Sequence, residues 1–358
     1  MKKWKFLVAT SLALAMTFNI NTISFAKELE TSTKENISED VPYSLVHYST
    51  EEIHTGEEPY ELTDMYITKD AVTLEKTGVS EFVDAKGILT DGSIEDISRY
   101  AIWESSDTEV AIADQGRILA QSKGNAIITV KYGNYSDSFP VTVEETIDTA
   151  QLIEQLSLSV YSYGNDERIE DLTRAVNMIN IAWTPTKNLT GWKGGKTFYA
   201  GTTYAGVPYS QTPNQIGTMQ AFVSSLSKTD FYTVYTSANG ITMPRYGNDC
   251  SGFVSLSWNI GRYTTTSLKD GIVSGKFPKV GNYNIASPTV TELKTAYASL
   301  VPGDAVVIGG NHTFMIAYND IANQKVQCYE QTPYNAQVTE WTYAEMANAK
   351  YLPFSKKY

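Results

Sequence analysis

Short alternating runs of apolar and polar residues, separated by turn residues, dominate the chain from about Tyr66 to Glu144. Each run has the length of a β-strand and places its apolar side chains on one face. The runs are AVTLEK, RYAIWESS, VAIAD, GRILAQ, AIITVKYG and SFPVTVEE. Because repeated short strands with one apolar face must pair and stack to bury that face, this stretch predicts an antiparallel β-sandwich.

The first 26 residues have the composition of a secretory signal peptide. Three lysines precede an apolar stretch, and Ser24 and Ala26 supply the small residues that a signal peptidase needs, so we expect cleavage after Ala26. Residues 27–62 are polar and acidic without a sustained period, which predicts a flexible leader. The mature protein is therefore expected to be secreted.

The net charge and the length of the chain limit its expected partners and its expected number of domains. Loss of three lysines moves the formal net charge from −12 to −15, which excludes nucleic acid and anionic lipid as natural partners. No later segment is apolar enough for stable membrane insertion. About 330 residues suggest two domains, which we place at 63–146 and 147–358, and the spacing of apolar residues predicts a helix over 166–183 at the start of the second.

One stretch of the first domain matches a known pattern. WESSDTEVAIADQGRILAQSKGNAIITVKYG resembles the second group of bacterial Ig-like domains, in which a Trp-Ser-Ser-Asp segment precedes a Gly-led strand and a Gly-containing turn. The resemblance covers most of residues 63–146 and implies a surface spacer or a module that binds a cell-wall or surface ligand. Nothing within it looks catalytic.

Cys250 stands at the start of a predicted helix in the second domain. It follows Asp249 in RYGNDCSGFVSLSWNI, where apolar residues recur at helical spacing, namely Phe253, Leu256 and Ile260. Unpaired backbone N–H groups and the helix dipole favour a thiolate at such a position. A buried structural cysteine, or a disulfide with Cys328, is the alternative, since Cys328 is the only other cysteine of the chain.

His312 is the only histidine after residue 62, and it lies in a predicted β-meander. The strands are expected over residues 305–308, 312–318 and 325–330. If Tyr318 pairs with Gln324, antiparallel counting puts His312 opposite Glu330 on the same face. A one-residue slip would put Gln331 opposite instead, so Gln331 remains the alternative partner.

These side chains have the types of a Cys-His-polar triad. His312 would remove the thiol proton of Cys250, the thiolate would attack an acyl carbon, and the imidazolium would protonate the leaving amine while Glu330 holds the ring. Backbone N–H groups at the helix start would stabilise the oxyanion. No cluster of Cys and His with metal-ligand spacing occurs in residues 147–358, so no metal and no other cofactor is expected.

Three motifs in this order, DCSGFV, VPGDAVVI and GNHTFMIAY, resemble the NlpC-type cell-wall cysteine peptidases of the papain-like superfamily. The resemblance covers roughly residues 166–358 and implies Cys250 as the nucleophile and His312 as the base. It also implies an α+β papain-like fold, with N-terminal helices and a central antiparallel sheet. The implied substrate is an amide bond of peptidoglycan stem peptides, between γ-D-glutamate and a diamino acid.

Two features depart from that family. Its third position is usually histidine, whereas Glu330 and the polar residues after it are similar to the related CHAP amidases, which keeps N-acetylmuramoyl-L-alanine amidase activity as an alternative. The family's Gly-x-Pro-Tyr segment lies close before the cysteine, but here GVPYS places Tyr209 about 40 residues upstream. Tyr209 is therefore a candidate for substrate binding only across an insertion. Asp249 and Ser251 flank the nucleophile and are candidates to bind a substrate amine, although Asp249 fits a helix N-cap equally well.

The sequence thus predicts a secreted, wall-associated protein, an all-β Ig-like sandwich followed by an α+β cysteine hydrolase. The motif around Cys250 favours catalysis over the disulfide, and Cys328 is then a small apolar side chain beneath the sheet. A catalytically inert wall-binding or adhesion protein is the alternative from another class.

Overall fold

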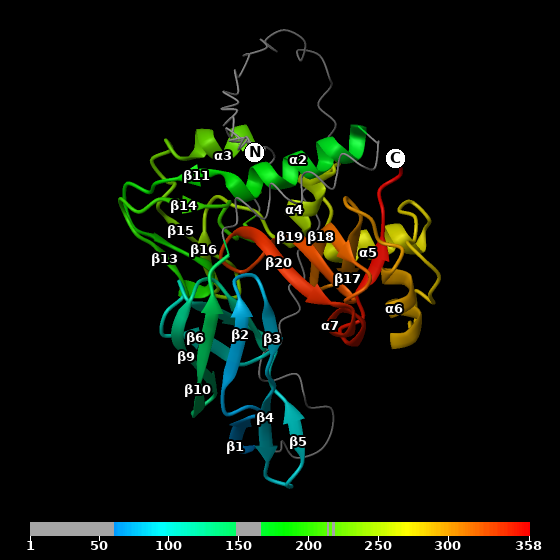
Figure 1. Ribbon diagram of the computed structural model, residues 1–358. Helices are drawn as coiled ribbons and strands as arrows, with labels where there is room; N and C mark the ends of the chain where they lie inside the picture. The colour runs from blue at the N-terminus through cyan, green and yellow to red at the C-terminus, as the bar shows by residue number, and fades with distance from the viewer. Residues whose placement is uncertain (1–60, 148–165, 213–214, 217–218) are drawn as a thin grey trace, which may run out of the picture. The chain divides into compact units, whose positions relative to one another are not determined.

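The computed structural model describes residues 61–147, 166–212, 215–216 and 219–358 (Figure 1). The predicted signal peptide and nearly all of the predicted leader lie outside these residues. The described residues belong to one compact unit and contain two large hydrophobic cores. No helix among them is long and apolar enough to cross a membrane.

Residues 61–147, here called the N-terminal β region, are built from strands and turns. The strands are β1 (Leu62–Ile67), β2 (Val72–Lys76), β3 (Ser80–Phe82), β4 (Ala85–Leu89), β5 (Ile94–Asp96), β6 (Ile102–Ser105), β7 (Ala111–Asp114), β8 (Arg117–Ala120), β9 (Gly124–Tyr132) and β10 (Tyr135–Glu145). They form three sheets, in the orders β1-β4-β5, β2-β10-β9-β6 and β3-β8-β7. The six predicted strands are confirmed as β2 and β6 to β10, whereas β1, β3, β4 and β5 were not predicted.

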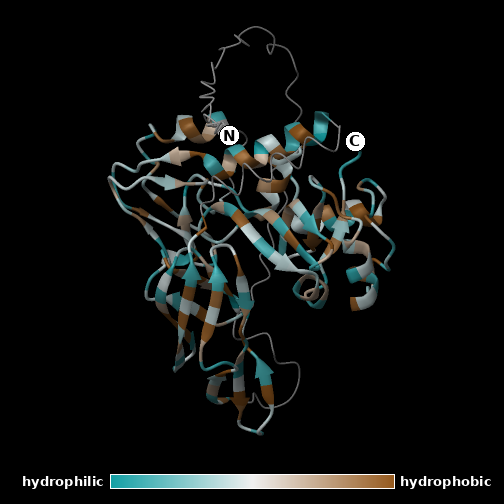
Figure 2. Ribbon diagram, in the orientation of Figure 1, coloured by the Kyte–Doolittle hydropathy of each residue, from teal (hydrophilic) through white to brown (hydrophobic). Residues whose placement is uncertain are grey.

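Apolar and polar residues alternate along the strands of this region, as the brown and teal bands of Figure 2 show. On β9 the burial pattern alternates strictly from Ala126 to Val130, and on β10 from Phe139 to Val143. The buried side chains of these strands join one core. Of the strands that the sequence did not reveal, β5 lacks this alternation, since all three of its residues are exposed.

The hairpin of β7 and β8 later forms one wall of the site. Its two-residue turn, Gln115–Gly116, has φ values of 51° and 88°, the left-handed conformations that a type I′ turn requires. A Cβ at Gly116 would lie 2.8 Å from the carbonyl oxygen of Val83, so a side chain does not fit there. The turn places Asp114 directly opposite Arg117 in the ladder.

Residues 166–358, here called the C-terminal region, contain helices and strands in alternation. The elements are α2 (Asp166–Asn180), β11 (Ala182–Trp183), β12 (Leu189–Thr190), the 3-10 helix η2 (Trp192–Gly194), β13 (Thr197–Phe198), β14 (Tyr204–Ala205), α3 (Met219–Ser225), β15 (Val234–Thr236), β16 (Thr242–Pro244), α4 (Cys250–Ser257), α5 (Thr265–Val273), α6 (Val290–Tyr297), β17 (Ala305–Ile308), β18 (His312–Asp320), β19 (Lys325–Gln331), β20 (Ala336–Thr342), α7 (Tyr343–Asn348) and β21 (Leu352–Phe354). The predicted helices at 166 and 250 and the predicted three-stranded meander are confirmed.

The largest sheet has five strands in the order β20-β19-β18-β17-β21, and every neighbouring pair is antiparallel. Helix α4 packs against β18 and against α2. From Thr313 to Ala317, successive residues of β18 are all buried, so this central strand is covered on both faces. The core that results joins α2, α4 and this sheet.

The predicted fold class is wrong. Strands make up 38% of the structure and helices only 20%, so the protein is mainly β rather than a sandwich followed by an α+β papain-like domain. The strands of the described residues fall into seven separate sheets, three of them in the N-terminal β region and three two-stranded. The physical reason lies in residues 182–244, for which the sequence analysis named no strand and whose Tyr, Thr and Val residues favour short paired strands.

Candidate functional site

Cys250 is the first residue of α4, and the residue before it sets the helix start. Asp249 is extended, and its Oδ1 accepts a hydrogen bond from the backbone N–H of Gly252 at 2.7 Å. This is an N-cap, which satisfies one of the free N–H groups of the first turn. The Cys250 side chain therefore lies at the positive end of the helix dipole, where a negative sulfur is stabilised.

Both cysteines are free thiols in the structure, so the predicted disulfide alternative is not what is observed. Cys250 is 4% exposed, whereas Cys328 is fully enclosed in the core beneath the sheet. Burial in the first place, and then the charge of Glu330, raise the pKa of Cys328 well above its ordinary value. Cys328 is thus a neutral, enclosed thiol at neutral pH.

His312 begins β18 and joins Cys250 to Glu330. Its Nε2 lies 2.7 Å from Oε1 of Glu330. Because Nε2 contacts Glu330, Nδ1 is the ring nitrogen left for Cys250. The side chains of Cys250 and His312 also interact by a hydrogen bond. Thiol, imidazole and carboxylate therefore form one chain of contacts from α4 through β18 to β19.

Glu330 is fully buried, and both oxygens of its carboxylate are hydrogen-bonded. Arg117 of β8 donates from Nη1 to Oε1 at 2.6 Å and from Nη2 to Oε2 at 3.3 Å. From β20, Trp341 Nε1 donates to Oε2 at 3.2 Å and the Thr339 hydroxyl donates to the same oxygen. A buried carboxylate needs such compensation, because an ionised group without partners is very costly to desolvate.

The predicted strand register is wrong, although His312 and Glu330 still meet. The prediction paired Ile316 with Val326, but the structure pairs Ile316 with Cys328, and a β-bulge follows Ile316. At Tyr318, which pairs with Gln327 instead of Gln324, the difference is three residues along β19, and the bulge reduces it to two residues from Ile316 toward His312. Because side chains alternate with a period of two, an even shift leaves the predicted face of each residue unchanged.

Neighbouring charges shift the pKa values of His312 and Glu330. Burial by itself lowers the pKa of His312, but the charges of Cys250 and Glu330 and the hydrogen bonds to both raise it to about 10. Burial raises the pKa of Glu330, yet the Arg117 guanidinium and His312 together hold it well below its usual range. At neutral pH, His312 is therefore an imidazolium beside an ionised Glu330.

Gln331, the alternative partner, does not contact His312. Its Nε2 donates to the carbonyl oxygen of Val207 at 2.9 Å, and its Oε1 is buried without a hydrogen-bond partner among the described residues. Gln331 follows Glu330 on β19 and so points to the opposite face of the sheet. Of the two residues left open by the sequence, the structure brings Glu330 to the imidazole.

Asp249 and Ser251 hold the helix start instead of lining the cavity at His312. Besides capping α4, Asp249 Oδ1 accepts a hydrogen bond from the Ser251 hydroxyl at 3.0 Å, and Oδ2 pairs with Arg262 Nη2. Arg262 also donates to Ser251 Oγ at 3.0 Å. Both residues are buried, so the structure supports the N-cap alternative for Asp249 and shows a neighbouring polar cluster for Ser251.

Tyr209 lies close to Cys250, despite its distance in the sequence. It forms a parallel bridge with Asn248, two residues before Cys250, and its ring lies against Trp192 with centroids 4.9 Å apart. Its hydroxyl accepts a hydrogen bond from Gln211 Nε2 at 3.0 Å. Burial first, and then the nearby charge of Cys250, raise the pKa of Tyr209, so the phenol is neutral at neutral pH.

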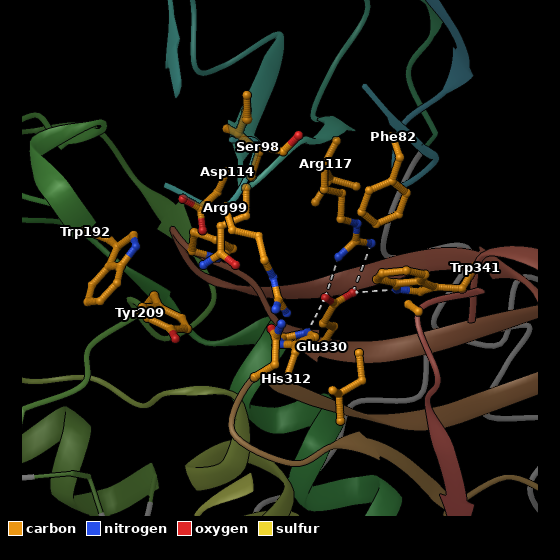
Figure 3. A pocket seen from close by; sticks show the side chains of 18 of the residues that line it. Phe82, Ser98, Arg99, Asp114, Arg117, Trp192, Tyr209, His312, Glu330 and Trp341 are labelled. Atoms are coloured by element: carbon orange, nitrogen blue, oxygen red, sulfur yellow. Dashed lines mark hydrogen bonds and ion pairs between the residues drawn. The ribbon is translucent and has the colours of Figure 1, made fainter. Parts of the chain in front are cut away.

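A cavity of about 710 Å³ opens over His312 and Glu330. The C-terminal region also contributes Trp192 and Tyr209 to it, and the N-terminal β region contributes Arg99, between β5 and β6, and Asp114 and Arg117 of the β7–β8 hairpin (Figure 3). In Figure 3 the side chains of Arg99 and Arg117 extend from that wall toward His312 and Glu330. The site is thus lined by both regions.

Arg117 is the residue of the candidate site that the sequence did not reveal, since residues 63–146 were expected to contain nothing catalytic. In the sequence, Arg117 is one charged residue at the start of a strand, after a turn glycine. Strand alternation predicts on which face it lies, but no local pattern tells which distant carboxylate it meets. Its partner Glu330 is 213 residues further along the chain.

Comparison with known proteins adds little. No family model and no curated protein matches this chain. Two of the solved structures with partial similarity are domains 5–6 and domains 4 and 5 of the S-layer protein SbsC, with 18% and 17% identity, TM-scores of 0.21 and coverage of 24% of this chain. The matches span about half of those structures, 45% and 54%. A likeness of this size carries no argument about the fold, the location or the activity of this protein.

Proposed function

We propose that this protein is a cysteine hydrolase that cleaves amide bonds, with Cys250 as the nucleophile, His312 as the acid and base, and Glu330 as the residue that orients His312. The observation that carries the proposal is the contact chain from Cys250 through His312 to the buried Glu330, in which His312 and Glu330 line a cavity large enough for a peptide segment. A structural cysteine needs neither the imidazole nor the cavity.

The reaction follows from the charges of the three groups. The imidazolium of His312 favours the thiolate of Cys250, which attacks the carbonyl carbon and forms a C–S bond. The imidazolium then gives its proton to the leaving amine as the C–N bond breaks. Water, deprotonated by the neutral His312, attacks the thioester, the carboxylic acid leaves, and the thiol is regenerated. The backbone N–H of Cys250 at the helix start would donate to the oxyanion.

The substrate class we propose is the stem peptide of peptidoglycan, in the cell wall outside the membrane. Support comes from the predicted signal peptide and from the resemblance of DCSGFV, VPGDAVVI and GNHTFMIAY to NlpC-type peptidases. That resemblance favours the bond between γ-D-glutamate and a diamino acid. The carboxylate at the third position favours N-acetylmuramoyl-L-alanine amidase activity of the CHAP type as the second candidate, because Glu330 stands where NlpC-type enzymes have histidine.

Mass spectrometry of muropeptides digested with the purified mature protein tests both candidates. Cleavage at the γ-D-glutamyl bond leaves a dipeptide on the muramic acid, whereas amidase cleavage releases the whole stem peptide. Cys250→Ala should abolish product formation, and Cys328→Ala, the matched control, should retain it. Unchanged muropeptides with the wild-type protein, which nevertheless reacts with iodoacetamide at Cys250, would contradict the proposed substrate. Lack of both reactions would contradict the proposed chemistry.

A further inference from the structure

Arg117 makes a contact that ties the N-terminal β region to the reactive groups. Its guanidinium donates hydrogen bonds to both carboxylate oxygens of Glu330, at 2.6 Å and 3.3 Å, and the Arg117 side chain is only 13% exposed. Two parallel N–H···O bonds to an ionised carboxylate are among the strongest and most directional hydrogen bonds in proteins. The orientation of the Glu330 carboxylate is therefore set from the opposite wall of the cavity.

Arg117 is itself held in place by two further contacts. Its Nε donates to Ser80 Oγ at 3.0 Å, and its guanidinium carbon lies 3.9 Å from the ring centroid of Trp341. Trp341 in turn donates to Glu330. Ser80 on β3 and Arg117 on β8 belong to paired strands, so the three-stranded sheet of this wall supplies a preorganised cation.

We propose that Arg117 is a positioning residue for the reaction of Cys250, so that the N-terminal β region completes the catalytic site. This inference rests on the proposed function. Arg117 and His312 share Oε1 of Glu330, and the carboxylate that orients the ring is thereby kept in one place and one ionisation state. Without Arg117, the same carboxylate is left buried beside the imidazolium alone.

The charged and titratable groups around Glu330 determine the expected pH dependence. They are Arg117 on β8, His312 on β18, Cys328 on β19 and Tyr351 after α7. Burial raises the pKa of Glu330, and the Arg117 charge is the largest influence that lowers it. Removal of Arg117 thus moves the pKa of Glu330 upward, so Glu330 takes up a proton, and stops supporting the imidazolium, at a higher pH than in the wild type.

The test compares Arg117→Gln, Arg117→Lys and Ser80→Ala with the control Lys131→Gln, which removes an exposed cation on β9. We expect Arg117→Gln to lower kcat about 10-fold to 100-fold with little change in KM, and to move the acid limb of the pH profile to higher pH. Arg117→Lys, which keeps the charge but not the paired bonds, should restore part of kcat, and Ser80→Ala should cause the smallest loss. Lys131→Gln should resemble the wild type.

The rate of Cys250 alkylation by iodoacetamide across pH gives a readout that needs no substrate. The same upward move of the acid limb is expected for Arg117→Gln. Profiles of Arg117→Gln and Arg117→Lys that both coincide with the wild type in alkylation would overturn the role of Arg117, whether or not muropeptides are cleaved. Absence of muropeptide cleavage by the wild type would instead count against the proposed function alone. If Arg117→Gln does not fold, Arg117→Lys and Ser80→Ala decide the question.

A second, independent observation concerns the balance of charge in the cavity. The acids that line it all have a cation partner: Asp84 and Asp96 with Lys86 at 3.2 Å and 3.1 Å, Asp114 with Lys193 at 2.6 Å, and Glu330 with Arg117. Arg99 also lines the cavity, and among the residues that the structure describes it has no ion-pair or hydrogen-bond partner. Its side chain is directed into the cavity toward His312 (Figure 3).

We infer that Arg99 binds a carboxylate of the substrate. A guanidinium without a counter-ion in a lined cavity attracts an anion and can bind a carboxylate through two parallel hydrogen bonds. The expected ligand class is an acyl substrate that carries a free carboxylate close to the scissile bond. For the proposed substrate, this group is the α-carboxylate of a γ-linked glutamyl residue. Amidation of that residue removes the carboxylate.

Two alkylating agents that differ only in this group test Arg99 without a substrate. Iodoacetate carries a carboxylate and iodoacetamide the matching amide, and the label at Cys250 is measured by mass spectrometry. The ratio of the two rates should fall about 3-fold to 10-fold in Arg99→Gln, and high salt should lower it in the wild type. Arg99→Lys should keep part of the ratio. Arg245→Gln is the control outside the cavity and should leave the ratio unchanged.

Peptides with a γ-linked glutamyl α-carboxylate or α-carboxamide extend the test to turnover. The wild type should prefer the carboxylate form by about 10-fold or more in kcat/KM, and Arg99→Gln should remove the preference by raising KM for that form alone. An equal loss with both peptides, together with an unchanged alkylation ratio, would overturn the role of Arg99. If the wild type cleaves neither peptide, the proposed function fails, and the alkylation ratio decides on Arg99.

Discussion

The two regions that line the cavity contribute groups of different kinds. The C-terminal region supplies the thiol, the imidazole and the carboxylate, on elements that share one core. The N-terminal β region supplies the guanidinium groups of Arg99 and Arg117 and has no cysteine or histidine. Reacting groups must be in close contact and therefore lie on elements packed together, whereas a long arginine can reach across from a separate sheet.

Substitution of each of the two cysteines distinguishes a catalytic role from a packing role within the C-terminal region, and we expect the largest effect here. Cys250→Ala should lower kcat/KM by about 10⁴-fold or more, because the nucleophile is lost. Cys328→Ala should retain most of the activity, since Cys328 is enclosed in the core on β19. Muropeptide hydrolysis by the two purified variants measures this difference. Equal losses of kcat/KM in the two variants, at equal thermal stability, would show that Cys250 is not the nucleophile.

Substitution of Arg117 should lower the free energy of unfolding more than substitution of a residue that makes only surface contacts. Arg117→Ala leaves Glu330 buried with the imidazolium as its remaining charged partner, and we expect a loss of about 3–5 kcal/mol in the free energy of unfolding. Urea denaturation at neutral pH measures it. A loss below about 1 kcal/mol would mean that water reaches Glu330 as freely as it reaches a surface carboxylate.

The contrast between neighbours on β19 tests the orienting residue. Glu330→Gln should lower kcat about 10-fold to 10³-fold, because a neutral amide stabilises the imidazolium less well, whereas Gln331→Ala should change kcat little. The carboxylate helps to raise the pKa of His312 to about 10. Its loss lowers that pKa, so the limb at which the imidazolium loses its proton should move to lower pH. If Gln331→Ala proves the more damaging change, Glu330 is not the orienting residue.

The smallest effect is expected at a more exposed ion pair between the two regions, Lys193 with Asp114. Lys193 Nζ lies 2.6 Å from Asp114 Oδ1, but the lysine side chain is 41% exposed. Lys193→Ala should therefore change the free energy of unfolding by less than about 1 kcal/mol, and less still at high salt. Denaturation at low and high ionic strength measures this. A loss as large as that of Arg117→Ala would show that burial does not distinguish the two pairs.

Local patterns predicted the local structure well. The alternation in AIITVKYG and SFPVTVEE predicted β9 and β10, and the Asp-Cys pair before an apolar helical run predicted the start of α4. Both patterns act through neighbours in the chain, namely the pleat of a strand and the cap of a helix. The register of β18 on β19 was predicted wrongly, because β18 continues past Tyr318 to Asp320, which pairs with Lys325, so the loop between the strands is shorter than the sequence suggested.

By itself, the sequence determined which residues form the candidate site and which elements present them: Cys250 at a helix start, and His312 and Glu330 on neighbouring strands with side chains on one face. Tertiary structure alone decided how the strands of the described residues divide into seven sheets, that Tyr209 pairs with Asn248 close to Cys250, and that Arg117 binds Glu330 across the cavity. The reason is physical. Helix starts and strand faces depend on residues a few positions apart, whereas the partner of a buried charge depends on which distant surfaces pack together.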